Sequence, residues 1–172
     1  MDTIITSKDL QNHLDDLRNS QRSIALVPTM GYLHEGHLSL IRKARSENDA
    51  VVTTIFVNPL QFSETEDLDT YPKDIKKDTF LASDAGTDFL FTPSYEEMFC
   101  DDVLTTVSVQ EISSVLEGAS RPTHFSGVAT IVAKLFNIVG VCKAYFGEKD
   151  WQQIQVIRRM AQDLSYRVEI KG

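Results

Sequence analysis

The sequence contains little cysteine, and this limits its chemistry. Its two cysteines, Cys100 and Cys142, do not have the spacing of a metal site. Cys142 opens an apolar stretch that ends at Phe146, so we expect a small buried hydrophobic side chain there and not a reactive thiol. This cysteine usage fits a reducing cytoplasm.

Long apolar runs and an excess of positive charge are also missing. No segment approaches the ~18 consecutive apolar residues of a membrane span, and Met1–Thr3 lack the charge pattern of a signal peptide. The 17 Lys and Arg residues are outnumbered by 25 Asp and Glu residues, for a net charge of −8. We therefore expect no membrane partner and no nucleic-acid partner. The charge does not exclude a mononucleotide, which needs only a locally basic pocket.

What the sequence does contain is an almost continuous alternation of strand-like and helical patterns. With 172 residues, 42% of them hydrophobic, the chain is long enough for one domain with a substantial core. Strands separated by helices predict an α/β fold with a Rossmann-like, doubly wound and mostly parallel sheet. Such sheets bind ligands beyond the carboxyl ends of their strands, which is where we expect 28–37, 58–62 and 147–153.

The hydrophobic periodicity sets the expected boundaries. Helices are expected at 7–18, 37–48, 74–85, 126–139 and 151–164. Strands are expected at 23–28, 51–57, 89–91 and 143–146, with a last one beginning at Arg167. Ser7 is a candidate N-cap and Gly140 a candidate C-cap. In the ambiguous section 94–124, the pattern favours an edge strand at 103–109 and a short helix at 112–117.

The most informative segment is Pro28–His37. It joins the apolar run Ile24–Val27 to an amphipathic stretch, which predicts a strand, a tight glycine-bearing turn and a helix start. His34 and His37 are three positions apart, so a helical first turn would place them on one face. A helix start attracts phosphate through its N–H groups and its dipole. Two imidazole donors beside it suit a reaction that builds charge on phosphate, such as adenylyl or nucleotidyl transfer.

Four blocks of the sequence together resemble one enzyme family. They are Pro28–Leu40, Phe56–Phe62, Arg121–Val128 and Phe146–Gln153. Their text and their order are similar to those of the pantoate–β-alanine ligases, or pantothenate synthetases. The His-x-Gly-His motif alone occurs in many nucleotidyltransferases and aminoacyl-tRNA synthetases, so the specificity comes from the four blocks together. The resemblance implies the nucleotidyltransferase fold that carries this motif.

The resemblance also implies a two-step, ATP-dependent reaction. The carboxylate of pantoate attacks the α-phosphorus of ATP to give pantoyl adenylate and pyrophosphate. β-Alanine then attacks the acyl carbon and expels AMP. Catalytic roles fall to His34, His37 and Lys149, with His37 as the main donor to the phosphates. Mg²⁺ is expected with ATP, held mostly by substrate oxygens and not by a metal site of the protein.

The substrate-contacting residues follow from the same resemblance. For ATP they are Met30, Gly31, His34, Gly36, His37, Gly147, Glu148, Lys149 and Asp150. For pantoate they are Met30, Asn58, Gln61 and Gln153, with Gln61 also linked to β-alanine. A neutral glutamine amide binds hydroxyl and carboxylate groups without lowering the nucleophilicity of the carboxylate. Glycine lets the backbone approach a nucleotide, and Asp150 suits the hydroxyls of ribose.

Several of these residues also have ordinary structural interpretations. One histidine of the pair would cap or pack the helix start, and Gly31 would be a plain turn glycine. Met30 would be a core side chain. Asn58 precedes a proline, as turn formers often do, and Asp150 would be the N-cap of the next helix.

Other polar residues leave further alternatives open. A zinc site at His34 and His37 would need more ligands, for which only His124 is at hand. Within the third block, Arg121 and His124 are assigned to the pocket wall or to the phosphate side. The acidic run Glu64–Asp69 is assigned to a solvated loop and not to a metal site.

The family continues into a second, smaller domain with a loop that clamps the phosphates of ATP. We therefore expect residues 1–172 to be the N-terminal nucleotide- and pantoate-binding domain, without the C-terminal domain, and to bind substrate with little turnover. The family also implies a homodimer. Two rival functions stay open. One is a nucleotidyltransferase acting on phosphopantetheine, which gives no reason for the glutamine blocks; the other is a non-catalytic pantoate- or nucleotide-binding module.

Overall fold

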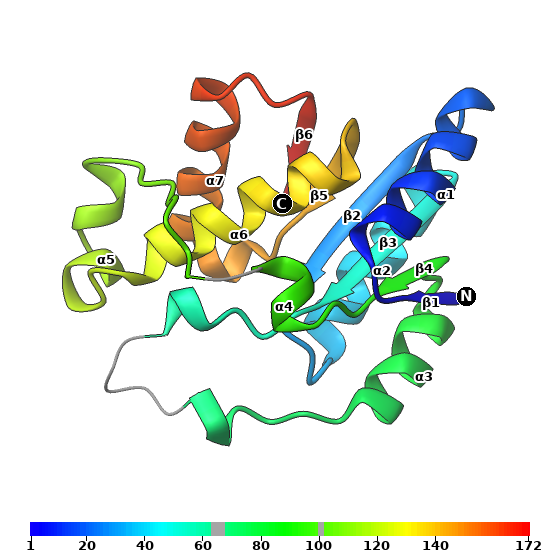
Figure 1. Cartoon of the computed structure of the whole chain (residues 1–172), viewed down its shortest axis with the longest axis horizontal. Helices are drawn as coiled ribbons and strands as arrows, with labels where there is room; N and C mark the ends of the chain where they lie inside the picture. The colour runs from blue at the N-terminus through cyan, green and yellow to red at the C-terminus, as the bar shows by residue number, and fades with distance from the viewer. Residues whose placement is uncertain (63–67, 100–101) are drawn as a thin grey trace.

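A parallel sheet forms the centre of the computed structural model, which describes residues 1–62, 68–99 and 102–172 (Figure 1). Its strands are β1 (Asp2–Ile4), β2 (Ile24–Thr29), β3 (Ala50–Ile55), β4 (Phe89–Phe91), β5 (Cys142–Tyr145) and β6 (Val168–Lys171). They are ordered β1-β4-β3-β2-β5-β6, and each neighbouring pair is parallel. The expected α/β fold is confirmed. The strand order reverses between β2 and β5, and doubly wound sheets bind ligands at such a point.

Helices cover both faces of the sheet. Helices α1 (Ser7–Asn19), α6 (His124–Val139) and α7 (Trp151–Asp163) share one hydrophobic cluster, and α2 (Glu35–Glu47) and α3 (Ile75–Ala85) share the other. The connecting segments contain α4 (Tyr95–Met98), α5 (Glu117–Ser120) and the short 3-10 helices η1 (Pro59–Gln61), η2 (Leu68–Thr70), η3 (Ile112–Ser114) and η4 (Glu148–Asp150).

Strand β2 shows why the central part of the sequence reads as a continuous apolar run. Successive side chains of a strand point to opposite faces of a sheet. Leu26 accordingly belongs to the cluster with α1 and α6, whereas Ala25 and Val27 belong to the cluster with α2 and α3. All of these side chains are fully buried. A strand covered on both faces has no polar side, which is typical of parallel sheets.

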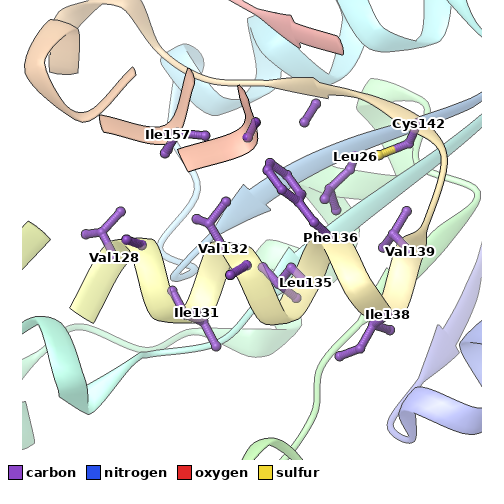
Figure 2. Packing of buried hydrophobic residues seen from close by; sticks show 14 of the residues in the cluster. Leu26, Val128, Ile131, Val132, Leu135, Phe136, Ile138, Val139, Cys142 and Ile157 are labelled. Atoms are coloured by element: carbon purple, nitrogen blue, oxygen red, sulfur yellow. The ribbon is translucent and has the colours of Figure 1, made fainter. Parts of the chain in front are cut away.

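Helix α6 contributes the longest row of side chains to the core. Figure 2 shows Phe136 pointing from α6 toward the sheet and toward Leu26, with Ile157 of α7 on the same side. Ile131 and Ile138 point to the opposite side of the helix (Figure 2). Cys142, the first residue of β5, belongs to the same core cluster and is 7% exposed. Burial raises the pKa of its thiol to about 12, so the prediction of an inert, buried side chain is confirmed.

Most element boundaries agree with the sequence, and the exceptions have local causes. The cap of α1 is Thr6 and not Ser7, because the Thr6 hydroxyl accepts the N–H of Asp9 at 3.2 Å. Strand β1 was not expected, since it is short and its first residues are polar and exposed. Gly140 does end α6, with a φ of +72° that favours glycine.

The expected edge strand at 103–109 is wrong. The segment packs against α6 without joining the sheet: the N–H of Val107 donates to the Thr130 hydroxyl at 2.9 Å, and its carbonyl accepts from the Ser126 hydroxyl at 3.2 Å. Side chains of a helix thus replace the neighbouring strand. The expected helix at 112–117 is also wrong, because the chain forms the separate η3 and α5, with Leu116 between them at a φ of +51°.

Some expectations fall outside the described residues. They concern Cys100 and the acidic residues Glu64, Glu66 and Asp67. In the part of the chain that the structure describes, no helix is long and apolar enough to cross a membrane.

Candidate active site

A cavity of about 290 Å³ opens at the carboxyl ends of β2 and β5. The expected site residues that line it are Met30, His34, Gly36, His37, Asn58, Gln61, Gly147, Lys149, Asp150 and Gln153. Gly31 and Glu148 are not among its lining residues. Three of the four sequence blocks supply these residues, and the third block contributes Val128, so the structure brings all four blocks together at the point where the strand order reverses, as expected for ligands of this fold.

One wall of the cavity is apolar, and the sequence did not reveal it. Its residues are Val128, Ile131, Val132 and Leu135 of α6, together with Phe56 and Phe146. Thr29 and Tyr71 also line the cavity without having been expected there. The helical spacing of α6 correctly indicated burial, but it does not distinguish a side chain that packs in the core from one that faces a cavity.

Two imidazoles form the start of α2. His34 is the N-cap, and its Nδ1 accepts the backbone N–H of Gly36 at 3.1 Å. The Nδ1 of His37 accepts the backbone N–H of His34 at 3.4 Å, and the ring centroids are 4.1 Å apart. Because each Nδ1 accepts a hydrogen bond, each neutral ring carries its proton on Nε2. The capping interpretation is confirmed, and it is compatible with the donor interpretation, since the atoms that cap the helix leave the Nε2–H groups as donors.

The environment of His37 favours its neutral form. Burial lowers the pKa of this imidazole below 6.5, and the neighbouring His34 lowers it further. Asp78 and Asp150 oppose this shift without reversing it. His37 is therefore a neutral hydrogen-bond donor at pH 7 and not an imidazolium.

We expect His37 to titrate below 6.5 and to show the Nε2–H tautomer by ¹⁵N NMR across a pH series. As the pH falls from 6.5 toward this lowered pKa, the unfolded chain takes up the proton first, so the free energy of unfolding decreases. Above 6.5 both states are neutral and the contribution is complete. His37→Gln removes the resonance and so assigns it. A pKa above 6.5 would contradict this account of the site.

The turn between β2 and α2 explains the requirement for Gly31. Its φ of +87° lies in the left-handed region, and a Cβ there would lie 3.0 Å from Asp78 Oδ2 and from Ile55 Cγ2. The Gly31 N–H donates to the Thr29 hydroxyl at 3.1 Å. Gly31 lines a second hollow on the other side of this turn. Its turn role is thus structural, whereas Gly36 lies in the wall of the cavity itself.

A chain of hydrogen-bonded neutral side chains also lines the cavity. The Nδ2 of Asn58 donates to Gln61 Oε1 at 3.1 Å, and Gln61 Nε2 donates to the sulfur of Met30 at 3.0 Å. Asn58 Oδ1 also accepts the N–H of Leu60 at 3.3 Å, so Asn58 both caps η1 and orients Gln61. The turn-forming interpretation of Asn58 is confirmed, and the residue still faces the cavity.

Gly127 allows η1 to lie directly against α6. A Cβ at this position would be 2.1 Å from the carbonyl oxygen of Leu60 and 2.5 Å from the nitrogen of Gln61. The Gly127 carbonyl accepts from Asn58 Nδ2 at 3.1 Å, and the buried His124 donates from Nδ1 to the Gln61 carbonyl at 3.0 Å. His124 therefore positions Gln61 from behind and does not line the cavity, so of its two expected assignments the pocket wall is not supported and the phosphate side stays a prediction.

The neighbouring glutamines Gln152 and Gln153 have different surroundings. Gln152 is 8% exposed; its Oε1 accepts the N–H of Glu117 at 3.1 Å, and its Nε2 donates to the carbonyls of Ile112 and Val115 at 2.9 and 2.7 Å. It therefore holds the segment around η3 against α7. Gln153 lines the cavity instead.

The segment after β5 brings charged groups to the cavity. Lys149 and Asp150 line it and are exposed to solvent. Asp150 occupies the N-cap position of α7, but its side chain makes no capping hydrogen bond, so the carboxylate is not used for capping. A Cβ on Gly147 would have no neighbour within 4 Å, so packing within the protein does not require glycine there. Space beside the Gly147 backbone is what the close approach of a ligand requires.

Two alternatives that the sequence left open, Arg121 in the pocket wall and a zinc site at the histidines, are not supported by the geometry. Arg121 forms an ion pair with Glu117 at 2.9 Å and is not part of the cavity wall. His124 does not join His34 and His37, and among the described residues no three His, Cys, Asp or Glu side chains gather as a metal site. The zinc alternative therefore lacks a third ligand in this part of the chain.

Comparison with known proteins shows the family of this chain. Residues 2–172 match the family described as pantoate-beta-alanine ligase. The chain belongs to this family. The pantothenate synthetase of Rhizobium meliloti (strain 1021) is 56% identical over 172 residues, which is 100% of this chain and 59% of that protein. The pantothenate synthetase of Staphylococcus carnosus (strain TM300) is 49% identical over 173 residues, 100% of this chain and 60% of that protein.

Solved structures of ligases in the family confirm the fold. Pantothenate synthetase from Thermus thermophilus matches with a TM-score of 0.94 and 48% identity, over 100% of this chain and 61% of that chain. The Francisella tularensis pantoate-beta-alanine ligase, complexed with beta-gamma ATP and beta-alanine, matches with a TM-score of 0.94 and 41% identity, over 99% of this chain and 66% of that chain. The chain thus spans about three-fifths of the length of the curated relatives that it matches.

Proposed function

We propose that this chain is the N-terminal nucleotide- and pantoate-binding domain of an ATP-dependent pantoate–β-alanine ligase that acts through a pantoyl adenylate. The observation that carries the proposal is a single cavity lined both by donors, His34, His37 and Lys149, and by the neutral amides of Gln61 and Gln153. We refer to these two groups of lining residues as the donor side and the amide side. Family membership supports the reaction, and the ligands of the Francisella tularensis enzyme support ATP and β-alanine as substrates.

The donor side of the cavity suits ATP. The Nε2–H groups of His34 and His37 remain to donate to a ligand, because the Nδ1 atoms accept backbone N–H groups at the start of α2. Lys149 adds a positive charge for the phosphates. The open space at Gly147 suits close contact with the nucleotide, and the uncapped carboxylate of Asp150 suits ribose hydroxyls. We assign Met30 and Gly36 to the same nucleotide site, with Glu148 and Gly31 shaping its backbone.

The amide side suits pantoate, which carries hydroxyl groups and a carboxylate. Gln61 is held by Asn58, and Gln153 lies on α7. Amide groups bind the carboxylate without forming an ion pair, so its oxygen keeps its nucleophilicity. The apolar wall of α6 covers the methyl groups of pantoate and excludes water.

In the proposed first step, a pantoate carboxylate oxygen attacks the α-phosphorus of ATP and the bond to the bridging oxygen of pyrophosphate breaks. Negative charge grows on the phosphate oxygens, and the Nε2–H of His37 and the Lys149 ammonium are positioned to stabilise it. In the second step, the amine of β-alanine attacks the acyl carbon and AMP leaves with the bonding electron pair. The amine loses a proton, and the amide of pantothenate forms.

Magnesium would accompany ATP in this reaction and neutralise phosphate charge. The part of the chain that the structure describes offers Asp150 at the cavity but no cluster of three acidic or metal-binding side chains. This fits an ion held mostly by phosphate oxygens and water. By analogy with the family we also propose a homodimer and a cytoplasmic location.

The amide side of the cavity favours pantoate over the rival substrate, phosphopantetheine. A nucleotidyltransferase that uses a phosphate as nucleophile needs cationic groups around that phosphate, whereas this side offers Asn58, Gln61 and Gln153, which are all neutral. The ligase is therefore favoured.

The decisive experiment is a pyrophosphate-release assay with the full-length protein, ATP and Mg²⁺. Pantoate alone is expected to give one equivalent of pyrophosphate per site, and β-alanine is expected to turn this burst into continuous release. Phosphopantetheine in place of pantoate is expected to give none. Release with phosphopantetheine, or none with pantoate, would contradict the proposal. Substrate binding without any release would favour the non-catalytic module.

The two adjacent glutamines provide a matched pair of variants. Gln153→Ala and Gln61→Ala are expected to weaken pantoate binding about tenfold or more, with little change in ATP binding, because each amide faces the charged substrate. Gln152→Ala is expected to leave binding nearly unchanged but to lower the free energy of unfolding by about 1–3 kcal/mol, since the buried Gln152 amide makes three hydrogen bonds to the backbone that the variant loses. Calorimetry and thermal melts measure both effects. The reverse pattern would exchange the two roles.

A further inference from the structure

Asp78 is a buried acid whose partners lie in the turn that carries the histidine motif. It is 2% exposed and belongs to α3, far from this turn in the sequence. Its Oδ2 accepts the backbone N–H of Tyr32 at 2.7 Å, and its Oδ1 accepts the backbone N–H of Leu33 at 2.7 Å. Both bonds are short, as expected when the acceptor is charged.

The position of Asp78 is unusual for a carboxylate. It lies on the same buried face of α3 as Ala82 and Ala85, which pack into the core cluster with α2. Burying a carboxylate is unfavourable unless hydrogen bonds compensate for lost water. The turn supplies these hydrogen bonds. We therefore attribute the buried carboxylate to its contacts with the turn and not to the stability of α3.

The turn needs such a partner because its backbone is strained. Gly31 and Tyr32 are consecutive residues with φ angles of +87° and +51°, and a side chain at Tyr32 makes this conformation unfavourable. The two left-handed residues turn the chain so that the N–H groups of Tyr32 and Leu33 point to the same side, where the Asp78 carboxylate accepts both. The strained turn is therefore held from one side by Asp78 and from the other by the Thr29 hydroxyl.

The held turn sets the direction of the two imidazoles. His34 follows Leu33 directly, and its backbone N–H reaches the Nδ1 of His37. A shift of Leu33 would move the N-cap of α2 and with it both Nε2–H groups. Burial and His34 lower the pKa of His37, and the Asp78 charge partly offsets them, which also shows the two groups to be electrostatically close.

We propose that Asp78 is a positioning residue for adenylate formation: it fixes the β2–α2 turn so that His34 and His37 present their Nε2–H groups to the phosphates. The role in adenylate formation rests on the proposed function. The claim that Asp78 fixes the turn rests only on its hydrogen bonds to Tyr32 and Leu33. Asp78 does not line the cavity, so it acts through the turn and not on the substrate.

The test uses Asp78→Asn in the full-length protein, which keeps the shape but turns an NH₂ group toward one of the two backbone N–H groups. Single-turnover pyrophosphate release is expected to slow about 10²-fold, as for a small misplacement of catalytic groups. Pantoate affinity, measured by calorimetry, is expected to stay at the parent value, because the amide side is held by η1 and α6. Amide hydrogen exchange at Tyr32 and Leu33 is expected to accelerate. Asp84→Asn, an exposed acid on the same helix, is the matched control and is expected to change none of these.

Unchanged pyrophosphate release in Asp78→Asn, or an equal loss of pantoate and ATP binding, would overturn the proposal. If Asp78→Asn does not fold, Gly31→Ala strains the turn from the other side, since its Cβ would lie 3.0 Å from Asp78 Oδ2 while α3 is left intact. The same kinetic pattern is then expected, and parent-like release would overturn the proposal. If the parent protein releases no pyrophosphate with pantoate, the proposed function fails, whereas the exchange rates at Tyr32 and Leu33 still test the role of Asp78.

Discussion

His37→Ala in the full-length protein is expected to slow adenylate formation by about 10²–10³-fold while pantoate affinity stays close to that of the parent. His37 presents an Nε2–H whose value as a donor grows as charge develops on the phosphates, so its loss affects the transition state more than the bound substrates. Its capping bond to the His34 N–H is long, at 3.4 Å, and its loss is expected to change stability little.

Single-turnover pyrophosphate release and pantoate calorimetry measure the two quantities separately. His13→Ala is the matched control, because His13 is an exposed imidazole on α1 and does not line the cavity. Comparable adenylation rates in His37→Ala and the parent would show that the donor is not used in the first step. An equal loss in rate and in pantoate affinity would indicate instead that the ring shapes the pocket.

Residues 1–172 produced alone are expected to bind pantoate but to show almost no turnover. Gln61, Gln153, both histidines and the segment around Gly147 all line the cavity of this chain, so the side that we propose for pantoate is formed. Adenylation also needs donors around the whole triphosphate and closure against water, which we propose the remainder of the full-length protein supplies. An ATP site open to solvent also gains less from each charged contact, so ATP is expected to bind more weakly.

This separation is measured with one preparation of residues 1–172, by pantoate titration and by pyrophosphate release. The full-length protein is the control for both. Turnover close to that of the full-length protein would show that the further residues are dispensable and would end this account of closure. Failure to bind pantoate would show that the amide side is incomplete in residues 1–172.

The sequence was informative where local pattern and burial agree. The run Ile24–Val27 predicted a strand, and its continuous apolar character comes from the burial of both of its faces. Gly140 predicted the end of α6 because glycine tolerates that backbone conformation most easily. At 103–109 the local pattern led to a wrong prediction. β-Branched residues suit any half-buried extended chain, and they do not show whether its backbone pairs with a strand or with side chains of α6.

What the sequence did not reveal depends on contacts between distant segments. Asp78 belongs to an otherwise apolar face of α3, which is a detectable irregularity, but nothing in α3 names Tyr32 and Leu33 as its partners. Gly127 reads as one small residue in a helix until η1 is placed against it. Gln152 is a similar case. The sequence alone does not show which of two adjacent glutamines faces a cavity and which one binds a neighbouring segment, because that depends on what packs against α7.

The reversal of strand order between β2 and β5 also has a consequence for how the protein acquires its binding site. The first half of the cavity comes from the β2–α2 turn and η1, which precede β4 in the chain, and the strands β2, β3 and β4 pair with one another in this early part. The other half, with Gly147 and Gln153, exists only after α6 and β5 have docked beside β2. A ribosome-bound chain would therefore gain affinity for its ligands only near the completion of this domain. A ligand bound in the mature cavity joins early and late segments, so it protects the whole domain from unfolding and not one local region.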